Sequence, residues 1–258
     1  MINTLDFLRG QLNIPLKTVF LQSCDSTNNY CKLLSKESNE DLLVIALSQT
    51  AGKGRLGRSF YSPKDSGIYM SVLLHPTISA EQCTLITTAA AVAASIAIDR
   101  ISGKNSLIKW VNDIYLDGKK VCGILSEAGF TGLGAVLDYA VLGIGINLFD
   151  PPDGFPEDIK NKAGSVLGRK TPCDSIKAEF INTFIGLFLD IYHTLPHASY
   201  MEEYRNRSLL GGKTVSFIRN GKGYYGKVQD INDKAELTVE TQEGTVTLFA
   251  GEVSIDFT

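Results

Sequence analysis

The chain has 258 residues, 44% of them hydrophobic, and a formal net charge of −3 with a pI of about 5.7. This length suits one large domain or a large domain with a small companion, and the acidic balance argues against a general nucleic-acid-binding protein. The N-terminus lacks the basic and apolar regions of a secretory signal. The most apolar run, residues 83–98, is too short for a clean membrane span.

The N-terminal region predicts a strand followed by a helix. The strand is expected over residues 19–22, and the cap-type residues 25–27 come directly before the helical pattern. Tyr30, Leu33 and Leu34 recur at helical spacing, so we expect them to form the buried face of this helix.

Further strands are predicted wherever apolar residues run continuously or alternate. They are expected at residues 42–47, 67–74, 107–111, 121–130 and 136–148. Asp117 and Gly118 form a hairpin signal between two of these strands.

Two longer helices are predicted between the strands. Ser79 and Gln82 form a capping-box pattern for an Ala-rich helix that ends before Gly103. A second helix begins near residues 171–172, and its residues at core spacing are Ile176, Phe180, Phe184, Leu187 and Ile191. Between them, residues 149–165 contain three prolines and two glycines, which predicts a long mobile loop.

The C-terminal fifty residues consist of short alternating segments with turns at Asn220-Gly221 and Glu243-Gly244. This pattern predicts a small antiparallel barrel. The whole chain therefore predicts an α+β fold, in which helices flank a mixed sheet in domain 1–208 and an all-β domain follows at 209–258.

Cysteine and histidine usage gives no sign of a disulfide framework or a metal site. The five cysteines form no C-x-x-C pair, and an odd number favours a reduced, cytoplasmic environment. His193 and His197 are four residues apart, but Pro196 lies between them and no glutamate follows His193, so the zinc-protease pattern fails.

The stretch "GKGRLGRS" at residues 52–59 matches G-x-G-x-x-G and nearly matches a P-loop. Both motifs require a helix directly after the glycines, whereas "FYSPKDSG" contains a proline and a glycine and does not support one. What remains is a loop with three glycines and three cations, Lys53, Arg55 and Arg58, which suits a ligand with several phosphates.

A second polar cluster also indicates a ligand site. Lys109, Asn112, Asp113 and Lys120 lie at the ends of apolar strands, and Asn147 follows the apolar "VLGIGI". An Asn-Asp pair near a phosphate loop is a natural place for Mg²⁺, although such a pair alone is more often a turn.

Together these motifs resemble the biotin protein ligases. The matching segments are "DSTN" at 25–28, "QTAGKGRLGR" at 49–58, "KWVND" at 109–113, "KKVCGILSE" at 119–127, "GIGIN" at 143–147 and "GEVS" at 251–254. Their order and spacing agree over about nine-tenths of the chain. The resemblance implies a class II synthetase-like catalytic domain with a C-terminal SH3-like barrel.

The resemblance also implies a two-step activity. ATP and Mg²⁺ convert biotin to biotinyl-5'-adenylate, and a lysine of a biotin carboxyl carrier domain then attacks it. Arg55 and Lys120 would be catalytic. Biotin would contact Ser26, Thr27, Asn28, Gln49, Gly52, Lys53, Gly54, Arg55, Lys120, Gly123 and Gly143.

The nucleotide would be held by a second set that the resemblance implies. ATP would contact Arg55, Arg58, Phe60, Lys109, Asn112, Asp113 and Asn147, and Mg²⁺ would bind Asp113 and Asn147. The loop 149–165 would be a lid over the adenine.

Some features depart from the usual family pattern. Lys53 stands where an arginine is common, which keeps the charge but loses bidentate geometry. Phe60 replaces a frequent tryptophan, and Val111 a frequent proline. Only about 24 residues precede "DSTN", so we expect no N-terminal DNA-binding domain and a ligase that is not a repressor, without nucleic-acid or membrane partners. A homodimer is plausible from the resemblance.

Two other functions remain open at this point. A lipoate ligase or octanoyltransferase shares the superfamily fold and the acylation of lysine, and a non-catalytic sensor of biotinyl-adenylate would use the same pocket. The long basic glycine loop and the C-terminal barrel favour biotin.

Overall fold

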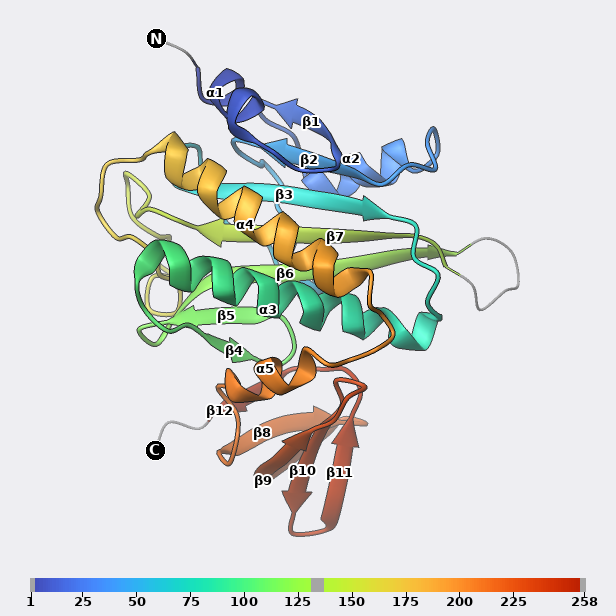
Figure 1. Cartoon of the computed structure of the whole chain (residues 1–258). Coiled ribbons are helices and arrows are strands. Elements are labelled where there is room, and N and C mark those ends of the chain that lie inside the picture. The colour runs from blue at the N-terminus through green and yellow to red at the C-terminus, as the bar shows by residue number, and fades with distance from the viewer. Residues whose placement is uncertain (1–2, 131–136, 256–258) are drawn as a thin grey trace.

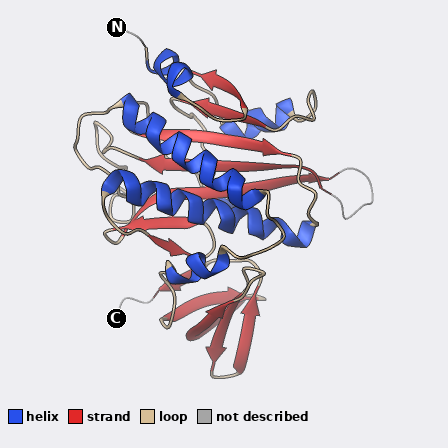
Figure 2. Cartoon of the chain, in the orientation of Figure 1, coloured by secondary structure: helices blue, strands red, loops and turns tan. Residues whose placement is uncertain are grey.

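Two β-sheets organise the chain, as seen in a computed structural model that describes residues 3–130 and 137–255 (Figure 1). The larger sheet has seven strands in the order β1-β2-β3-β7-β6-β5-β4, and only the β1–β2 pair is parallel. The smaller sheet is antiparallel, in the order β11-β10-β9-β8-β12. The two long helices pack on the larger sheet, and the smaller sheet is built from strands alone (Figure 2), which confirms the predicted α+β class.

The elements of the first sheet and its helices are α1 (Thr4–Gln11), β1 (Lys17–Leu21), α2 (Thr27–Leu34), β2 (Leu42–Ala46), β3 (Gly67–Leu74), α3 (Cys83–Ser102), β4 (Leu107–Lys109), β5 (Asp113–Leu116), β6 (Lys119–Phe130), β7 (Leu137–Asn147), α4 (Asp174–Tyr192) and α5 (Met201–Asn206). The second sheet contains β8 (Thr214–Arg219), β9 (Lys222–Ile231), β10 (Leu237–Thr241), β11 (Gly244–Leu248) and β12 (Val253–Ile255).

Helices α3 and α4 pack side by side across one face of the large sheet (Figure 1), while α2 covers part of the opposite face, against β2, β3 and β7. Successive side chains of the central strands point to opposite faces of the sheet, as they do in any pleated strand. In β3, for example, Met70 and Val72 join the core under α3 and α4, whereas Leu73 packs in the separate cluster around Cys31 of α2.

The ends of α3 follow the predicted chemistry. The Gln82 side chain accepts a hydrogen bond from the Ser79 backbone at 3.0 Å, and Gly103 ends the helix in the left-handed region with φ 70°. The segment Ala80–Ser102 is long and apolar enough to cross a membrane, but 72% of its apolar window is buried. Its packing against α4 and β6 is that of a core helix.

Two predicted helix faces were partly wrong. Leu33 is 58% exposed, and α2 instead buries Thr27, Asn28 and Cys31. In α4, Phe180 and Phe184 are buried as predicted. Ile176, Leu187 and Ile191 are only half-buried, and the fully buried positions include Ile181, Ile185 and Phe188.

Strand boundaries differ slightly from those predicted. The strand expected over 107–111 ends at Lys109, and a cis peptide joins Trp110 to Val111. The predicted start at Val136 lies outside the described residues. Asp117-Gly118 and Asn220-Gly221 are the predicted two-residue turns, with positive φ at all four residues. The β10–β11 turn falls at Gln242-Glu243, one residue before the prediction.

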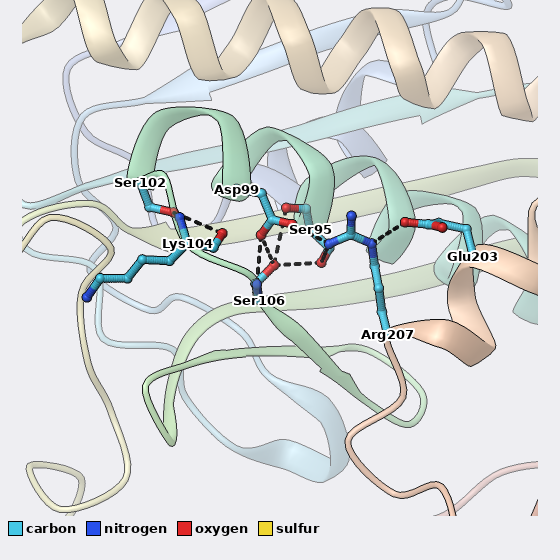
Figure 3. Close-up of polar contacts among 7 residues, drawn as sticks. All are labelled: Ser95, Asp99, Ser102, Lys104, Ser106, Glu203 and Arg207. Carbon is cyan, nitrogen blue, oxygen red and sulfur yellow. Dashed lines mark hydrogen bonds and ion pairs between the residues drawn. The ribbon is translucent and has the colours of Figure 1, made fainter.

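A half-buried ionic cluster lies where the chain passes to the second sheet (Figure 3). Arg207 pairs with Asp99 of α3 and, at 2.6 Å, with Glu203 of α5, and it donates to Ser95 at 3.0 Å. Asp99 also accepts hydrogen bonds from the backbone and hydroxyl of Ser106, both at 2.7 Å. The cluster therefore holds together the end of α3, the segment before β4 and the segment after α5.

The large sheet also bonds to the segment that leads into the second sheet, and the two sheets share a core. Ile108 of β4 donates to the Arg207 carbonyl at 2.7 Å, and Leu209 donates back to Ile108 at 2.8 Å. The indole of Trp110 donates to the Ala235 carbonyl at 2.8 Å. Because one hydrophobic cluster spans both sheets, they pack as a single body along this junction.

Candidate functional site

A pocket opens on the face of the large sheet opposite α3 and α4. Fifteen of the predicted site residues line it: Ser26, Thr27, Asn28, Gln49, Lys53, Gly54, Arg55, Arg58, Phe60, Lys109, Asn112, Asp113, Lys120, Gly123 and Gly143. They come from the start of α2, the glycine loop, the segment 109–113 and strands β6 and β7. Residues before β12 complete the rim. The fold thus gathers side chains from segments far apart in the sequence.

Glycines form the floor of this pocket. A Cβ atom on Gly143 would lie 2.0 Å from Oδ1 of Asn28, and one on Gly145 would lie 2.5 Å from the Phe60 ring. Gly123 pairs with Gly145 across β6 and β7, and its Cβ position also meets Phe60, at 3.2 Å. These glycines allow Asn28 and Phe60 to lie directly on the sheet.

Amide and hydroxyl groups gather at the α2 end of the pocket. Gln49 accepts from the Thr27 backbone at 2.8 Å and donates to Ser62 at 2.9 Å, so its amide orientation is set on both sides. Ser26 is 1% exposed and lines the pocket, and its hydroxyl has no hydrogen-bond partner in the described parts of the chain. That hydroxyl is available to a ligand.

Gly52 has a different place from the one predicted, since it does not line this pocket. Its carbonyl accepts from Phe60 at 2.8 Å, and a Cβ there would lie 2.5 Å from the Phe60 carbonyl. Gly52 therefore allows the loop to fold back on itself. The following residues form a short 3-10 turn, Arg55–Gly57, and then extended chain, so the helix that the Rossmann and P-loop patterns require is absent here.

The arginines of the glycine loop are tied to the rest of the protein. Arg55 donates to Asn112 at 2.9 Å and to the Gly251 carbonyl at 3.1 Å. Arg58 holds Glu252 with two hydrogen bonds, at 2.8 and 2.6 Å. The second sheet thus holds the loop over the pocket.

The opposite wall carries Lys109, Lys120 and Asp113. Lys120 lies 2.7 Å from Oδ1 of Asp113, an oxygen that is fully buried and has no other partner within the described residues. Burial lowers the pKa of Lys109, and Lys120 and Arg58 add to this, against the opposing charges of Asp113 and Glu252.

The pocket is electropositive as a whole. Five basic side chains line it, against two carboxylates, Asp113 and Glu252. Lys109 has no ion-pair partner within the described ranges, so its charge is available for an anionic ligand.

Asn147 and the loop 149–165 lie beside this pocket. Asn147 donates to the Gly164 carbonyl at 3.0 Å, and the backbone of Lys120 exchanges hydrogen bonds with Lys162 and Gly164, both at 2.9 Å. Pro156 and Ile159 line a second hollow on the outer side of the glycine loop. The loop is therefore anchored at its C-terminal end, and the lid role remains a prediction.

Metal and disulfide chemistry has little support among the described residues. No three His, Cys, Asp or Glu side chains gather as a metal site there, and all five cysteines are free. Asp113 is a pocket carboxylate suited to Mg²⁺, but Asn147 does not line the pocket. The predicted two-residue ligand pair is therefore not brought together there.

Several residues of the site were missed from the sequence. Ser71, Lys32 and Glu127 form hydrogen bonds with or near Asn28, and Glu252 holds Arg58. Ser71 carried a signal, because it is the only polar side chain in the apolar run "GIYMSVLL" apart from a tyrosine hydroxyl. Nothing in the sequence distinguishes Lys32 and Glu127 from ordinary surface residues.

Comparison with known proteins gives a consistent picture. Residues 20–147 match the model of the biotin/lipoate A/B protein ligase family. The bifunctional ligase/repressor BirA of Bacillus spizizenii is 33% identical over 234 residues, covering 87% of this chain and 69% of BirA. A biotin–[acetyl-CoA-carboxylase] ligase of Paracoccus denitrificans is 34% identical over 162 residues, or 62% of each chain.

A solved structure supports the same relationship. The biotin protein ligase from Aquifex aeolicus in complex with biotin and ATP superposes with a TM-score of 0.74 and 25% identity. The match covers 92% of this chain and 97% of that one.

Proposed function

This chain belongs to the biotin/lipoate A/B protein ligase family, and on that premise we propose that it is an ATP-dependent biotin protein ligase. It would form biotinyl-5'-AMP and transfer biotin to a lysine of a biotin carboxyl carrier domain. The observation that carries this proposal is the pocket itself: amide and hydroxyl groups lie at one end and unpaired positive charge at the other.

The α2 end of the pocket fits the ureido ring of biotin. The free hydroxyl of Ser26 can donate to the ureido oxygen, and Oδ1 of Asn28 keeps one lone pair for a ureido N–H. Gln49 is bonded to Thr27 and Ser62, which fixes the orientation of its amide, so its part is to support these groups.

The basic end would bind the carboxylate and the phosphates. In the first step a biotin carboxylate oxygen bonds to the α-phosphorus, while the bond from that phosphorus to the bridging oxygen breaks and pyrophosphate leaves. Lys109 and Lys120 would stabilise the negative charge there, in a site where burial strengthens the interaction.

Arg55 and Arg58 would join Lys109 and Lys120 around the phosphates. In the second step the amine of the acceptor lysine attacks the acyl carbon, the bond to AMP breaks and the amine loses a proton. Asn112, which holds Arg55, would keep that guanidinium at the mouth of the pocket.

Mg²⁺ would be held by Asp113 together with the ATP phosphates. Hard oxygen ligands suit this ion, which commonly binds through one or two carboxylates and substrate phosphates. Asp113 is the pocket carboxylate that no arginine holds, whereas Glu252 is paired with Arg58. The bound ion would neutralise phosphate charge.

The test is acceptor labelling with competing acids. Purified protein, ATP, Mg²⁺ and a carrier domain would be mixed with biotin, lipoic acid or octanoic acid, and the acceptor analysed by intact mass. We expect the biotinyl adduct alone, lost when the acceptor lysine is changed to arginine. Lipoyl or octanoyl adducts formed in preference would support the other family activities, and adenylate without any acceptor adduct would support a sensor.

A further inference from the structure

Asn28 is held in one orientation by three side chains that no part of the reaction itself requires. Its Nδ2 donates to Glu127 at 2.9 Å, and its Oδ1 accepts from Ser71 at 2.6 Å. Lys32 in turn pairs with the other oxygen of Glu127 at 2.6 Å. Asn28 is 4% exposed and Ser71 fully buried, so water does not compete for these bonds.

Strand register places Ser71 and Glu127 around Asn28, and Lys32 lies one turn after Asn28 on α2. Ser71 of β3 pairs with Gly143 of β7, and Gly143 pairs with Leu125 of β6, two residues before Glu127. Asn28 lies over Gly143, where no side chain intervenes.

The donor and acceptor pattern allows only one amide orientation. An ionised carboxylate accepts hydrogen bonds and cannot donate them, so the side of the amide facing Glu127 must be Nδ2. The Leu125 carbonyl, at 3.4 Å from Nδ2, adds a weaker preference of the same sign. A flipped Asn28 would place Oδ1 against Glu127, with two acceptors facing each other.

The charge on Glu127 is itself secured. Burial works to raise the pKa of this carboxyl, but hydrogen bonds from Lys32 and Asn28 and the charges of Lys32 and Lys53 outweigh it, and the pKa is lowered. Glu127 therefore remains an acceptor at neutral pH.

We propose that Glu127, Ser71 and Lys32 are positioning residues that determine acid specificity, because they hold Asn28 Oδ1 as an acceptor for a ligand N–H. The inference rests on the proposed function. A ureido ring supplies such a donor, whereas the hydrocarbon end of octanoic acid and the dithiolane of lipoic acid supply none. A buried acceptor left without a donor disfavours these acids.

The experiment compares biotin with octanoic acid in the wild type and in Glu127→Gln and Ser71→Ala. Dissociation constants come from titration calorimetry for biotin and from competition for octanoic acid. Pyrophosphate exchange gives kcat and KM. We expect Glu127→Gln to weaken biotin binding about 10–100-fold, since a hydrogen bond to a charged group is lost. Ser71→Ala should weaken it about tenfold.

In both variants the affinity for octanoic acid should stay within about twofold of the wild-type value. The kcat at saturating biotin should be unchanged, because the phosphates lie at the other end of the pocket. A merely structural role would lower the affinity for both acids together. Lys32→Met should also lower biotin affinity, because Glu127 loses the cation that pairs with it and that helps to keep its pKa low.

The matched control is Ser126→Ala. Ser126 neighbours Glu127 on β6 but accepts a hydrogen bond from Thr87 of α3, on the opposite face of the sheet. It should leave the biotin-to-octanoate ratio unchanged.

The outcomes separate this inference from the proposed function. Suppose that the wild type binds biotin, and that Glu127→Gln and Ser71→Ala both keep the wild-type ratio of the two dissociation constants. The positioning role is then overturned, while the proposed function stands. A wild type that binds octanoic acid as tightly as biotin overturns both.

Discussion

Replacing Gly143 with alanine tests the pocket floor most directly. The new Cβ would lie 2.0 Å from Oδ1 of Asn28, whereas ordinary contact begins at 3.4 Å, so the amide must move by about 1.4 Å. A shift of that size opens the 2.6 Å bond from Ser71 to roughly 4 Å, beyond hydrogen-bond range. The bond to Glu127 is lost with it.

The cost follows from these two bonds. One neutral hydrogen bond contributes about 0.5–1.5 kcal/mol and one to a charged group about 1.5–3 kcal/mol, so Gly143→Ala should lower the free energy of unfolding by roughly 2–4.5 kcal/mol. Biotin binding should weaken at least tenfold, to about the extent expected for loss of one oriented acceptor. Urea denaturation and calorimetric titration measure the two effects.

Gly186→Ala is the matched control. Gly186 lies within α4 with no atom within 4 Å of its Cβ position, so the change should be neutral or should stabilise by about 0.5–1 kcal/mol. The reasoning is refuted if Gly143→Ala binds biotin as the wild type does, because Asn28 would then have no role at the ligand.

Three further predictions concern charged residues. Glu252→Gln should speed hydrogen exchange of the backbone amides in the glycine loop, because Arg58 loses its ion-pair partner. It should change the free energy of unfolding by less than about 1 kcal/mol, since the pair is exposed. Unchanged exchange would contradict the idea that Glu252 holds the loop. Because burial lowers the pKa of Lys109, the KM for ATP should rise with increasing pH before ordinary lysines lose their charge, and Lys109→Arg should remove that rise. Arg207→Met should cost about 3–5 kcal/mol in urea denaturation because it leaves Asp99 half-buried and unpaired, while the exposed Arg9→Met should cost under about 1 kcal/mol; equal losses would argue against the cluster.

Local patterns predicted the scaffold well where local chemistry decides it. β3 begins and ends at the predicted residues 67 and 74, because an uninterrupted apolar run has no alternative to burial on both faces. Ser79 and Gly103 likewise marked the two ends of the helical segment that contains α3, because helix caps act within one turn.

Polar residues at the site misled the helix pattern. In α2, Leu33 has the right spacing for a core position but is exposed, because Thr27 and Asn28 take the buried face. Their burial is stabilised by Gln49 and Glu127, which are distant in sequence, and no window of local residues contains that information.

The predicted members of the site were largely brought together, but their partners were not foreseen. Arg55 and Arg58 were assigned to phosphates, yet their contacts with Gly251 and Glu252 depend on how the second sheet packs. Glu127 likewise acquires a role only through strand register, and Lys32 only through its pairing with Glu127. These are long-range consequences of the fold, which single-sequence periodicity does not encode.

The two-faced character of β3, β6 and β7 has a consequence for engineering. Where β6 and β7 pass under the pocket, Ile124, Ile144 and Ile146 belong to the main core, and the residues that alternate with them, Gly123, Gly143 and Gly145, lie at the pocket floor. A library restricted to the pocket-lining residues of these strands would therefore vary which acids the pocket admits while leaving the core under α3 and α4 unchanged. Ligand scope and foldability can be selected in separate rounds, on alternate letters of the same strands.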